Sequence, residues 1–285
     1  SRFFNTLWNA YNFVAMYMDA KPVERFSPAQ AKLLEVEDAW ILSRLNSFLE
    51  NALGNYNRYE YWRLVLDANR FVVDELSRTY IKLIRDRIGS ASEKSVQETL
   101  NYALFALLRV LAPITPHICE YLYQNFRTSK MPESVHLCAL PQADKKLINK
   151  KLEERIEFCR KLSQAVLALR EKHEMRLRWP LKEVVVKTAS GNEIGNAKKV
   201  LAMMCNADIA REVREKPKGN YAEKAVEDAS VHLCLDADSA LRERWELAEL
   251  TRRIQAMRKD LSLMPEQRVR LAIACSDPEF LERHK

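Results

Sequence analysis

Apolar side chains recur at intervals of three and four residues through most of the first 126 residues of this chain. These intervals match the 3.6-residue turn of an α-helix, so each run carries an apolar stripe that must be buried against a neighbour. The 285 residues include only five glycines, so few positions favour a sharp turn inside these runs. The pattern predicts that the chain begins with a bundle of helices.

Capping and breaking residues set the expected boundaries of these helices. The first run ends before Pro22, and the next helix is expected to begin at Ser27 and Pro28, where Gln30 completes a capping-box pattern. Glycines favour helix ends near Gly54 and Gly89. The expected helices cover about residues 4–18, 28–54, 62–88, 100–111 and 116–126.

The pattern changes after Pro141, where β-branched residues and alternating stripes appear. A helix over residues 152–169 is expected to lead into a strand near residues 183–188, and a second helix to cover residues 241–261. Alternation predicts two more strands, at residues 230–235 and 268–275, and residues 216–220 are expected to form an exposed loop. We therefore expect a mainly α protein with a helical bundle at residues 1–142 and a small α+β domain at residues 143–285.

Several classes of protein are disfavoured by what the sequence lacks. No apolar run approaches the roughly 18 to 20 residues of a membrane span, and there is no signal-peptide pattern. The six cysteines lack metal-ligand spacing, and five of them lie in apolar patterns, which is typical of buried thiols in the cytoplasm. No Gly-rich phosphate loop or nucleophile elbow is present. We expect no catalytic site, metal or other cofactor in this chain.

Positive charge is concentrated in one stretch of the sequence. Residues 1–142 hold 16 Lys and Arg against 15 Asp and Glu, which leaves 30 against 24 for residues 143–285. Between Lys145 and Lys187 there are 13 basic and 6 acidic residues, a local excess of seven that equals the net charge of the whole chain. Such a stretch suits a polyanion such as RNA, but it also suits a solvated helix face.

Aromatic residues offer a second route to RNA binding, through stacking on unpaired bases. Trp179 lies at an irregular junction inside the basic stretch, where Pro180 cannot continue a helix. Six other aromatic residues follow helical spacing, so we expect most of them to be packed in the core: Trp8, Tyr11, Trp40, Tyr61, Trp62 and Tyr80. A second basic group lies on one predicted helix face and consists of Arg78, Lys82 and Arg85.

Several segments together resemble the anticodon-binding region of isoleucyl-tRNA synthetases, and the resemblance covers nearly the whole chain in the same order. The later segments resemble the archaeal and eukaryotic type of the family. These segments are residues 3–9, 38–46, 71–81, 111–120, 133–137, 176–181 and 250–259. The His-Ile-Gly-His motif of the family's nucleotide-binding domain, its editing domain and the cysteine-rich zinc module of its bacterial branch have no counterpart in this sequence.

The resemblance implies the anticodon-binding bundle of a class Ia synthetase, separated from the domains that use ATP and Mg²⁺ to attach isoleucine to its tRNA. The implied partners are isoleucine tRNA and the catalytic and editing domains of the same polypeptide. Candidate RNA-binding residues combine the basic groups with the first resembling segment: Asn9, Arg78, Lys82, Arg85, Lys172, Arg176, Arg178, Trp179 and Lys182. The alternatives are the same region of a valyl- or leucyl-tRNA synthetase, and a helical protein-interaction scaffold.

Overall fold

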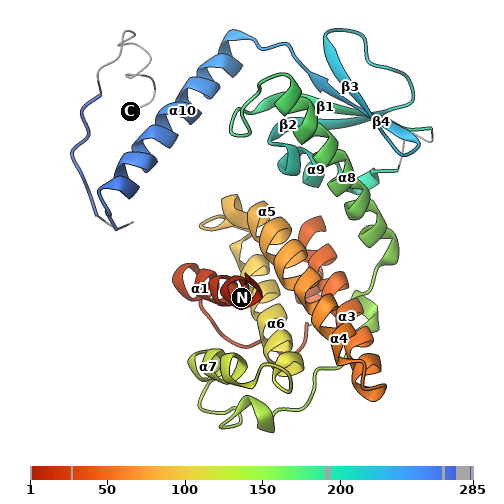
Figure 1. The fold of residues 1–285 in the computed structure, drawn as a ribbon, viewed down its shortest axis with the longest axis vertical. Helices are drawn as coiled ribbons and strands as arrows, with labels where there is room; N and C mark the ends of the chain where they lie inside the picture. Colours follow the sequence, from red (N-terminus) through yellow and green to blue (C-terminus); the bar gives the residue numbers. More distant parts are fainter. Residues whose placement is uncertain (1, 27, 190–192, 265–266, 274–282, 284–285) are drawn as a thin grey trace. The chain divides into compact units, whose positions relative to one another are not determined.

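The computed structural model describes residues 2–26, 28–189, 193–264, 267–273 and 283. Figure 1 labels helices as α and strands as β; η marks a 3₁₀ helix, except that η1 is a π-helix. In chain order they are α1 (Arg2–Tyr17), α2 (Pro28–Ala31), α3 (Val36–Asn57), α4 (Tyr61–Asn69), η1 (Arg70–Ile81), α5 (Lys82–Ile84), η2 (Arg85–Arg87), α6 (Glu93–Leu111), α7 (Pro116–Phe126), η3 (Val135–Leu137), η4 (Lys145–Leu147), α8 (Lys150–Lys172), β1 (Leu181–Lys187), η5 (Gly195–Ala197), α9 (Lys198–Cys205), β2 (Ala207–Val213), β3 (Tyr221–Val226), β4 (Ala229–Cys234) and α10 (Ser239–Asp260).

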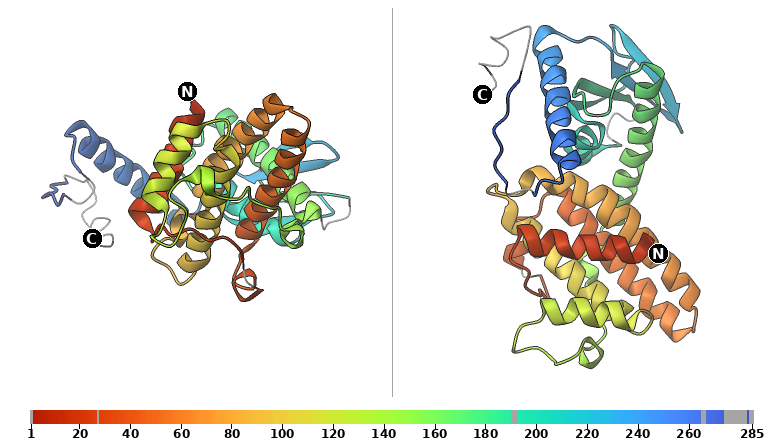
Figure 2. Two further views of the ribbon diagram at one scale, coloured as in Figure 1. Left: turned by 90° about the horizontal axis from the view of Figure 1, so that it is seen from below. Right: turned by 60° about the vertical axis from the view of Figure 1, so that its left-hand side comes forward.

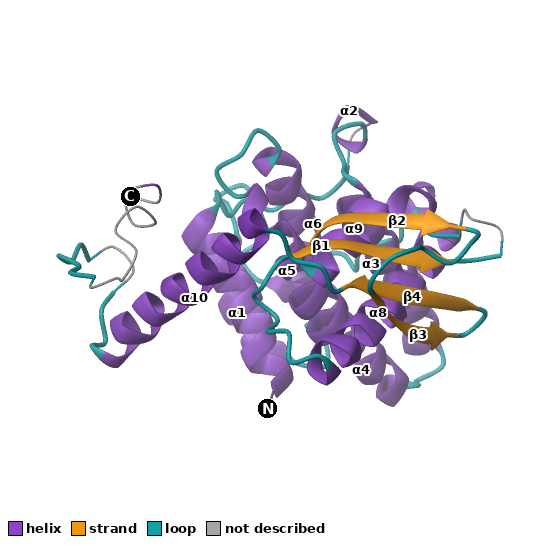
Figure 3. Ribbon diagram, turned by 90° about the horizontal axis from the view of Figure 1, so that it is seen from above, coloured by secondary structure: helices purple, strands orange, loops and turns teal. Residues whose placement is uncertain are grey.

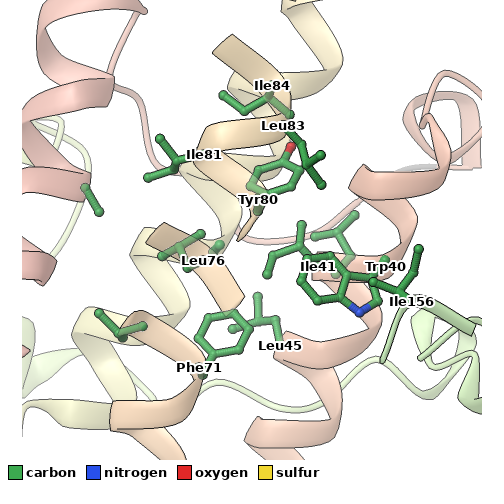
Figure 4. Packing of buried hydrophobic residues seen from close by; sticks show 14 of the residues in the cluster. Trp40, Ile41, Leu45, Phe71, Leu76, Tyr80, Ile81, Leu83, Ile84 and Ile156 are labelled. Atoms are coloured by element: carbon green, nitrogen blue, oxygen red, sulfur yellow. The ribbon is translucent and has the colours of Figure 1, made fainter. Parts of the chain in front are cut away.

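The predicted helical bundle is confirmed. Helices α3, α6 and η1 pack around a shared apolar core, α1 lies across η1, and α7 packs on α6 (Figure 2). Figure 4 shows part of this core, in which Trp40 and Leu45 of α3 face Phe71 and Tyr80 of η1. Apolar stripes from these five helices are therefore removed from water together, which is the main source of stability in such a bundle.

One continuous helical run from α4 to η2 confirms the predicted long helix, but its central part is a π-helix. Thr79 donates a side-chain hydrogen bond of 2.7 Å to the carbonyl of Asp74, five residues earlier. The wider π-turn shifts the buried face, so α4 buries Leu64 and Ala68. Helical spacing placed Trp62 on the apolar face of the predicted helix, but Trp62 is exposed, and so is Leu66 one turn further on.

The second predicted helix is interrupted. The short α2 ends at Ala31 and α3 begins at Val36, whereas the sequence predicted one helix from residue 28; Ser27, the expected cap, lies outside the described residues. At the start of α3, the backbone amide of Glu35 donates to the Asp38 carboxylate at 3.1 Å. Asp38 is itself buried and receives hydrogen bonds from Arg87 and Tyr80, so a long-range network fixes this helix start.

The second part of the fold is a four-stranded mixed sheet with strand order β2-β1-β4-β3 (Figure 3). β1 is parallel to β2 and antiparallel to β4, and α8 and α9 pack on each other and on the sheet. The strands predicted near residues 183–188 and 230–235 are confirmed as β1 and β4, and residues 216–220 form an exposed loop. Together with the bundle, this sheet confirms the predicted fold class.

The strand predicted at residues 268–275 is wrong over the described residues 267–273, which form no strand. Val269, Leu271 and Ile273 are exposed there, because none of the described strands covers the apolar face that the alternation produces. Residues 274 and 275, including Cys275, lie outside the described residues. The preceding helix was predicted correctly and is α10, which Asp238 caps through a 2.9 Å hydrogen bond from the amide of Leu241.

Contacts divide the chain into two compact units, residues 1–237 and residues 238–285. Within the first unit, α8 passes from the bundle to the sheet: Ile156 lies beside Trp40 of α3 (Figure 4), while α8 also packs on β3 and β4. The predicted division after residue 142 stays a prediction, because the two units are defined only by how densely their residues contact one another. Among the described residues, no helix is both long and apolar enough to cross a membrane.

Candidate nucleic-acid interface

A groove lies in the first unit where the bundle meets α8 and α9, and its volume is about 510 Å³. The bundle wall comes from η1 and α5, and the facing wall comes from α8, with one residue from α9. The lining residues are Asp74, Arg78, Thr79, Lys82, Leu83, Arg160, Ser163, Gln164, Leu167 and Met204. This groove brings one predicted basic group next to the helix that begins the basic stretch.

The lining is more basic than acidic. Arg78 forms an ion pair of 2.7 Å with Asp74, and Arg160 forms one of 2.8 Å with Glu157. Lys82 is exposed and makes no ion pair with any described residue. The Arg78–Asp74 pair is largely exposed and the Arg160–Glu157 pair is half-buried. Ion pairs that water reaches contribute little to stability, so these arginines can exchange a carboxylate for a phosphate at low cost. The groove thus offers three cations, together with the hydroxyl and amide groups of Thr79, Ser163 and Gln164.

Helical spacing explains why these side chains line the groove. Arg160, Gln164 and Leu167 follow one another at intervals of four and three residues along α8. The face of α8 that carries Ile156, Cys159 and Leu162 is buried instead. One face of α8 therefore packs in the core while an adjacent face is available to a ligand.

The basic stretch continues from α8 into a loop at residues 173–180. The guanidinium group of Arg176 lies 5.7 Å from the centre of the Trp179 ring, and Trp179 is half-buried. The amide of Trp179 donates to the carbonyl of Arg176 at 3.0 Å, which closes a tight turn. Arg176 and Arg178 are exposed, so this loop presents two cations and one indole directly after the helix that carries one wall of the groove.

The structure brings together only some of the predicted RNA-binding residues. Arg78 and Lys82 line the groove; Arg85 is exposed on η2, one turn further along the same helical run. The remaining predicted residues do not line the groove. They are exposed or half-buried on α1 (Asn9), at the end of α8 (Lys172), in the loop (Arg176, Arg178 and Trp179) and on β1 (Lys182).

Several cations of the basic stretch point to partners within the protein. Lys161 is hydrogen bonded to Glu227, and this bond raises the pKa of the lysine. Lys150 pairs with Glu153 at 3.2 Å, and Arg170 is buried. The local charge excess in the sequence therefore overstates how much positive charge the stretch offers to a ligand.

The prediction for the six aromatic residues is half confirmed. Tyr11, Trp40 and Tyr80 are buried, whereas Trp8, Tyr61 and Trp62 are exposed. Trp8 packs against Tyr121 of α7 with ring centres 5.4 Å apart, and Trp62 lies under Arg63 at 5.1 Å. Helical spacing identifies an apolar face but does not show whether a partner covers it, so the spacing alone overpredicted burial.

The sequence pattern did not single out four residues: Arg160, Ser163 and Gln164, which line the groove, and Arg170, which is buried beside the loop. A polar stripe beside the apolar face of α8 could have indicated the first three. Arg170 follows Leu162 and Val166 at intervals of four, so it falls on the apolar face of its helix. A charged residue at a core position indicates that the fold supplies hydrogen-bond partners for it, because a buried charge without partners is costly.

Comparison with known proteins agrees with this picture. Residues 38–186, more than half of the chain, match the family described as the anticodon-binding domain of tRNA ligase. Relatives named isoleucine–tRNA ligase include those of Methanopyrus kandleri (29% identical over 99% of this chain), Pyrococcus abyssi (32% over 88%) and Methanospirillum hungatei (35% over 68%).

These archaeal relatives are much longer than this chain, which spans 33%, 25% and 20% of their respective lengths. The resemblance to the archaeal type of isoleucyl-tRNA synthetase is confirmed by these similarities. The matched family segment begins in α3 and ends in β1, so it includes the groove residues of η1, α5 and α8 and the Arg176–Trp179 loop. The chain belongs to the family of the anticodon-binding domain of tRNA ligases.

Proposed function

We propose that this chain binds the anticodon stem and loop of isoleucine tRNA, as part of an isoleucine–tRNA ligase. The observation that carries the proposal is the groove in which Arg78 and Lys82 of the bundle face Arg160 of α8. Cations on two facing walls can contact phosphates from two sides, which a single helix face cannot do.

The two parts of the candidate interface suit different parts of the RNA. In the groove, Arg78, Lys82 and Arg160 would hold phosphates, and Gln164 can donate to and accept from a sugar or a base edge. In the loop, the indole of Trp179 offers a stacking surface for an unpaired base, and Arg178 adds a phosphate contact. Affinity would then come mainly from charge, and discrimination from the contacts to bases.

The relatives suggest a division of labour within a longer polypeptide. We propose that activation of isoleucine with ATP and Mg²⁺, and editing, belong to other domains, and that this chain needs no cofactor of its own. Cytoplasmic location is part of the proposal. All five described cysteines are free thiols, which is usual for proteins of a reducing compartment.

The test is binding of the 285-residue chain to isoleucine tRNA at several salt concentrations, with the same tRNA carrying an altered anticodon as the matched control. We expect the affinity to fall steeply with salt, because each phosphate contact releases counterions. The altered anticodon should bind more weakly by about 1 to 3 kcal/mol for each base that is read. Equal affinity for both RNAs would contradict anticodon recognition, and salt-independent binding would contradict the phosphate groove.

A second candidate function is supported by the exposed apolar face of α4. Trp62 is 62% exposed and Leu66 is 61% exposed, and Val65 lies between them in the sequence. Contiguous apolar surface of this kind is typical of protein contacts. A protein-interaction role predicts that Trp62→Ala and Leu66→Ala leave tRNA affinity unchanged while abolishing association with a protein partner.

A further inference from the structure

Arg170, near the end of α8, is almost completely buried, with 1% of its surface exposed, and it is hydrogen bonded to backbone carbonyls. Its Nη1 donates to the carbonyls of Arg176 at 2.8 Å and Trp179 at 2.9 Å. Its Nη2 donates to the carbonyls of Cys205 at 2.9 Å and Asn206 at 3.3 Å. One guanidinium group therefore joins the α8–β1 loop to the junction between α9 and β2.

No carboxylate of the described residues forms an ion pair with Arg170. Burial lowers the pKa of Arg170 to about 10, so the side chain remains a cation at neutral pH and keeps all of its donors. Partial negative charge on the carbonyl oxygens offsets the cost of burying this cation. The two nitrogens of the guanidinium fork each reach carbonyls of a different segment, and a lysine, with a single nitrogen, can reproduce only part of that geometry.

The α9–β2 junction holds the same loop from its other side. Asn206 adopts the left-handed conformation, with φ of 51°, and its side-chain amide donates to the carbonyl of Leu177 at 3.1 Å. The amide of Leu181 donates to the carbonyl of Asn206 at 2.8 Å. The backbone carbonyls of residues 176, 177 and 179 are thus all occupied inside the protein, while the side chains of Arg176 and Arg178 extend from the surface.

We propose that Arg170 is a positioning residue for RNA binding: its guanidinium group fixes the loop backbone so that Arg176, Arg178 and Trp179 are presented to the RNA. This proposal rests on the proposed function, because it assigns the loop to the tRNA interface. Arg170 touches no RNA itself. It acts by holding the loop in one conformation before binding, so that the loop loses less conformational entropy when the RNA binds.

The test compares Arg170→Met and Arg170→Lys with the double variant Arg176→Ala/Arg178→Ala, alone and in combination with Arg170→Met. We expect Arg170→Met to weaken tRNA binding on the order of tenfold and to flatten the salt dependence, because two phosphate contacts are misplaced. Arg170→Lys should recover part of the affinity. In the loop-alanine background, Arg170→Met should have little further effect, since residues that act as one unit are not additive.

Limited trypsin digestion measures how well the loop is ordered in the absence of RNA. In the wild-type chain the bonds after Arg176 and Arg178 should be cleaved slowly, and Arg170→Met should accelerate cleavage at both. The matched control is Arg87→Met, which removes a buried guanidinium group of the bundle, with 6% exposure, that makes no contact with the loop. It should lower the melting temperature without changing loop cleavage or the salt slope.

The outcomes separate this inference from the proposed function. Failure of the wild-type chain to bind tRNA would refute the proposed function, and with it an RNA-positioning role, while digestion would still show whether Arg170 orders the loop. Faster cleavage with unchanged tRNA affinity would refute positioning and leave Arg170 as a structural residue. Unchanged cleavage in Arg170→Met, or additive losses in the combined variant, would also overturn the inference.

Discussion

Ser43 of α3 donates a hydrogen bond of 2.6 Å to Glu153 of α8, although 110 residues separate them in the sequence. Glu153 also accepts from Ser47 at 2.7 Å and from Arg44 at 2.9 Å, and Arg44 continues to Glu75 of η1 at 3.0 Å. This buried network joins α8 to the bundle and so fixes one wall of the groove relative to the other. The candidate interface therefore depends on contacts that touch no RNA.

The first prediction concerns Glu153 and stability. Replacing Glu153 with Ala leaves Ser43 and Ser47 without their acceptor and removes one partner of Arg44, so we expect a loss of about 3 kcal/mol in the free energy of unfolding. Glu50→Ala is the matched control, because Glu50 is an exposed carboxylate of α3 that pairs with Lys145 at 3.5 Å. It should cost less than about 1 kcal/mol. Chemical denaturation measures both, and equal losses would contradict this role of Glu153.

The second prediction is the pH dependence of the same network. Burial acts to raise the pKa of Glu153, but hydrogen bonds from Ser43, Ser47 and Arg44 together outweigh it and leave the pKa below its ordinary value. A carboxyl group with a lowered folded pKa stabilises the protein above its unfolded pKa of about 4.3, and this stabilisation is lost as pH falls through the folded pKa. The stability difference between wild type and Glu153→Gln should therefore shrink below about pH 4. A constant difference across that range would contradict the prediction.

The third prediction uses the cysteine thiols as probes of the core. Burial raises the pKa of Cys119 to about 11 and those of Cys159 and Cys205 to about 12, so these thiols are protonated and inaccessible at pH 8. Cys138 is only partly buried and should react first. Labelling of a Cys275→Ser chain, followed by mass spectrometry, measures the order. Labelling of Cys159 as fast as Cys138 would show that α8 does not pack as described.

Local patterns in the sequence were sufficient for most of the helices, because apolar spacing and end signals act over a few residues. They failed where a distant contact decides the outcome. Asp38 fixes the start of α3 through Arg87 and Tyr80, and the π-helix shifts the buried face of α4. Residues 267–273 alternate like a strand, but no strand in the described part of the chain pairs with them.

The candidate site was predictable only in part, for a related reason. Arg78 and Lys82 share one helix face, and this could be read from their spacing. Their meeting with Arg160 depends on how α8 packs against η1 and α9, which no local pattern encodes. Arg170 shows the limit most clearly, because its four carbonyl partners come from two segments, the nearer of which begins six residues after it and the other 35 residues after it.

The fourth prediction tests the groove. Lys82→Glu reverses the charge of a cation that has no ion pair among the described residues, so we expect weaker tRNA binding together with a smaller salt slope. Arg160→Ala should act in the same direction. Lys161→Glu is the matched control, because it makes the same change of charge at a neighbour of Arg160 that does not line the groove. If the control weakens binding as much as Lys82→Glu, overall charge and not the groove determines affinity.

The last prediction concerns Arg176, Arg178 and Trp179, whose replacement should weaken RNA binding in different ways. Replacing both arginines with Ala should flatten the plot of log K against log salt by roughly one unit per lost phosphate contact. Trp179→Ala should reduce affinity by about 1 to 3 kcal/mol with little change in that slope, because stacking involves no counterion release. Trp179→Phe keeps an aromatic face and should retain most of the affinity. A fall in melting temperature without loss of affinity in Trp179→Ala would identify the indole as a packing residue, and unchanged affinity in a stable double-arginine variant would restrict the tRNA interface to the groove.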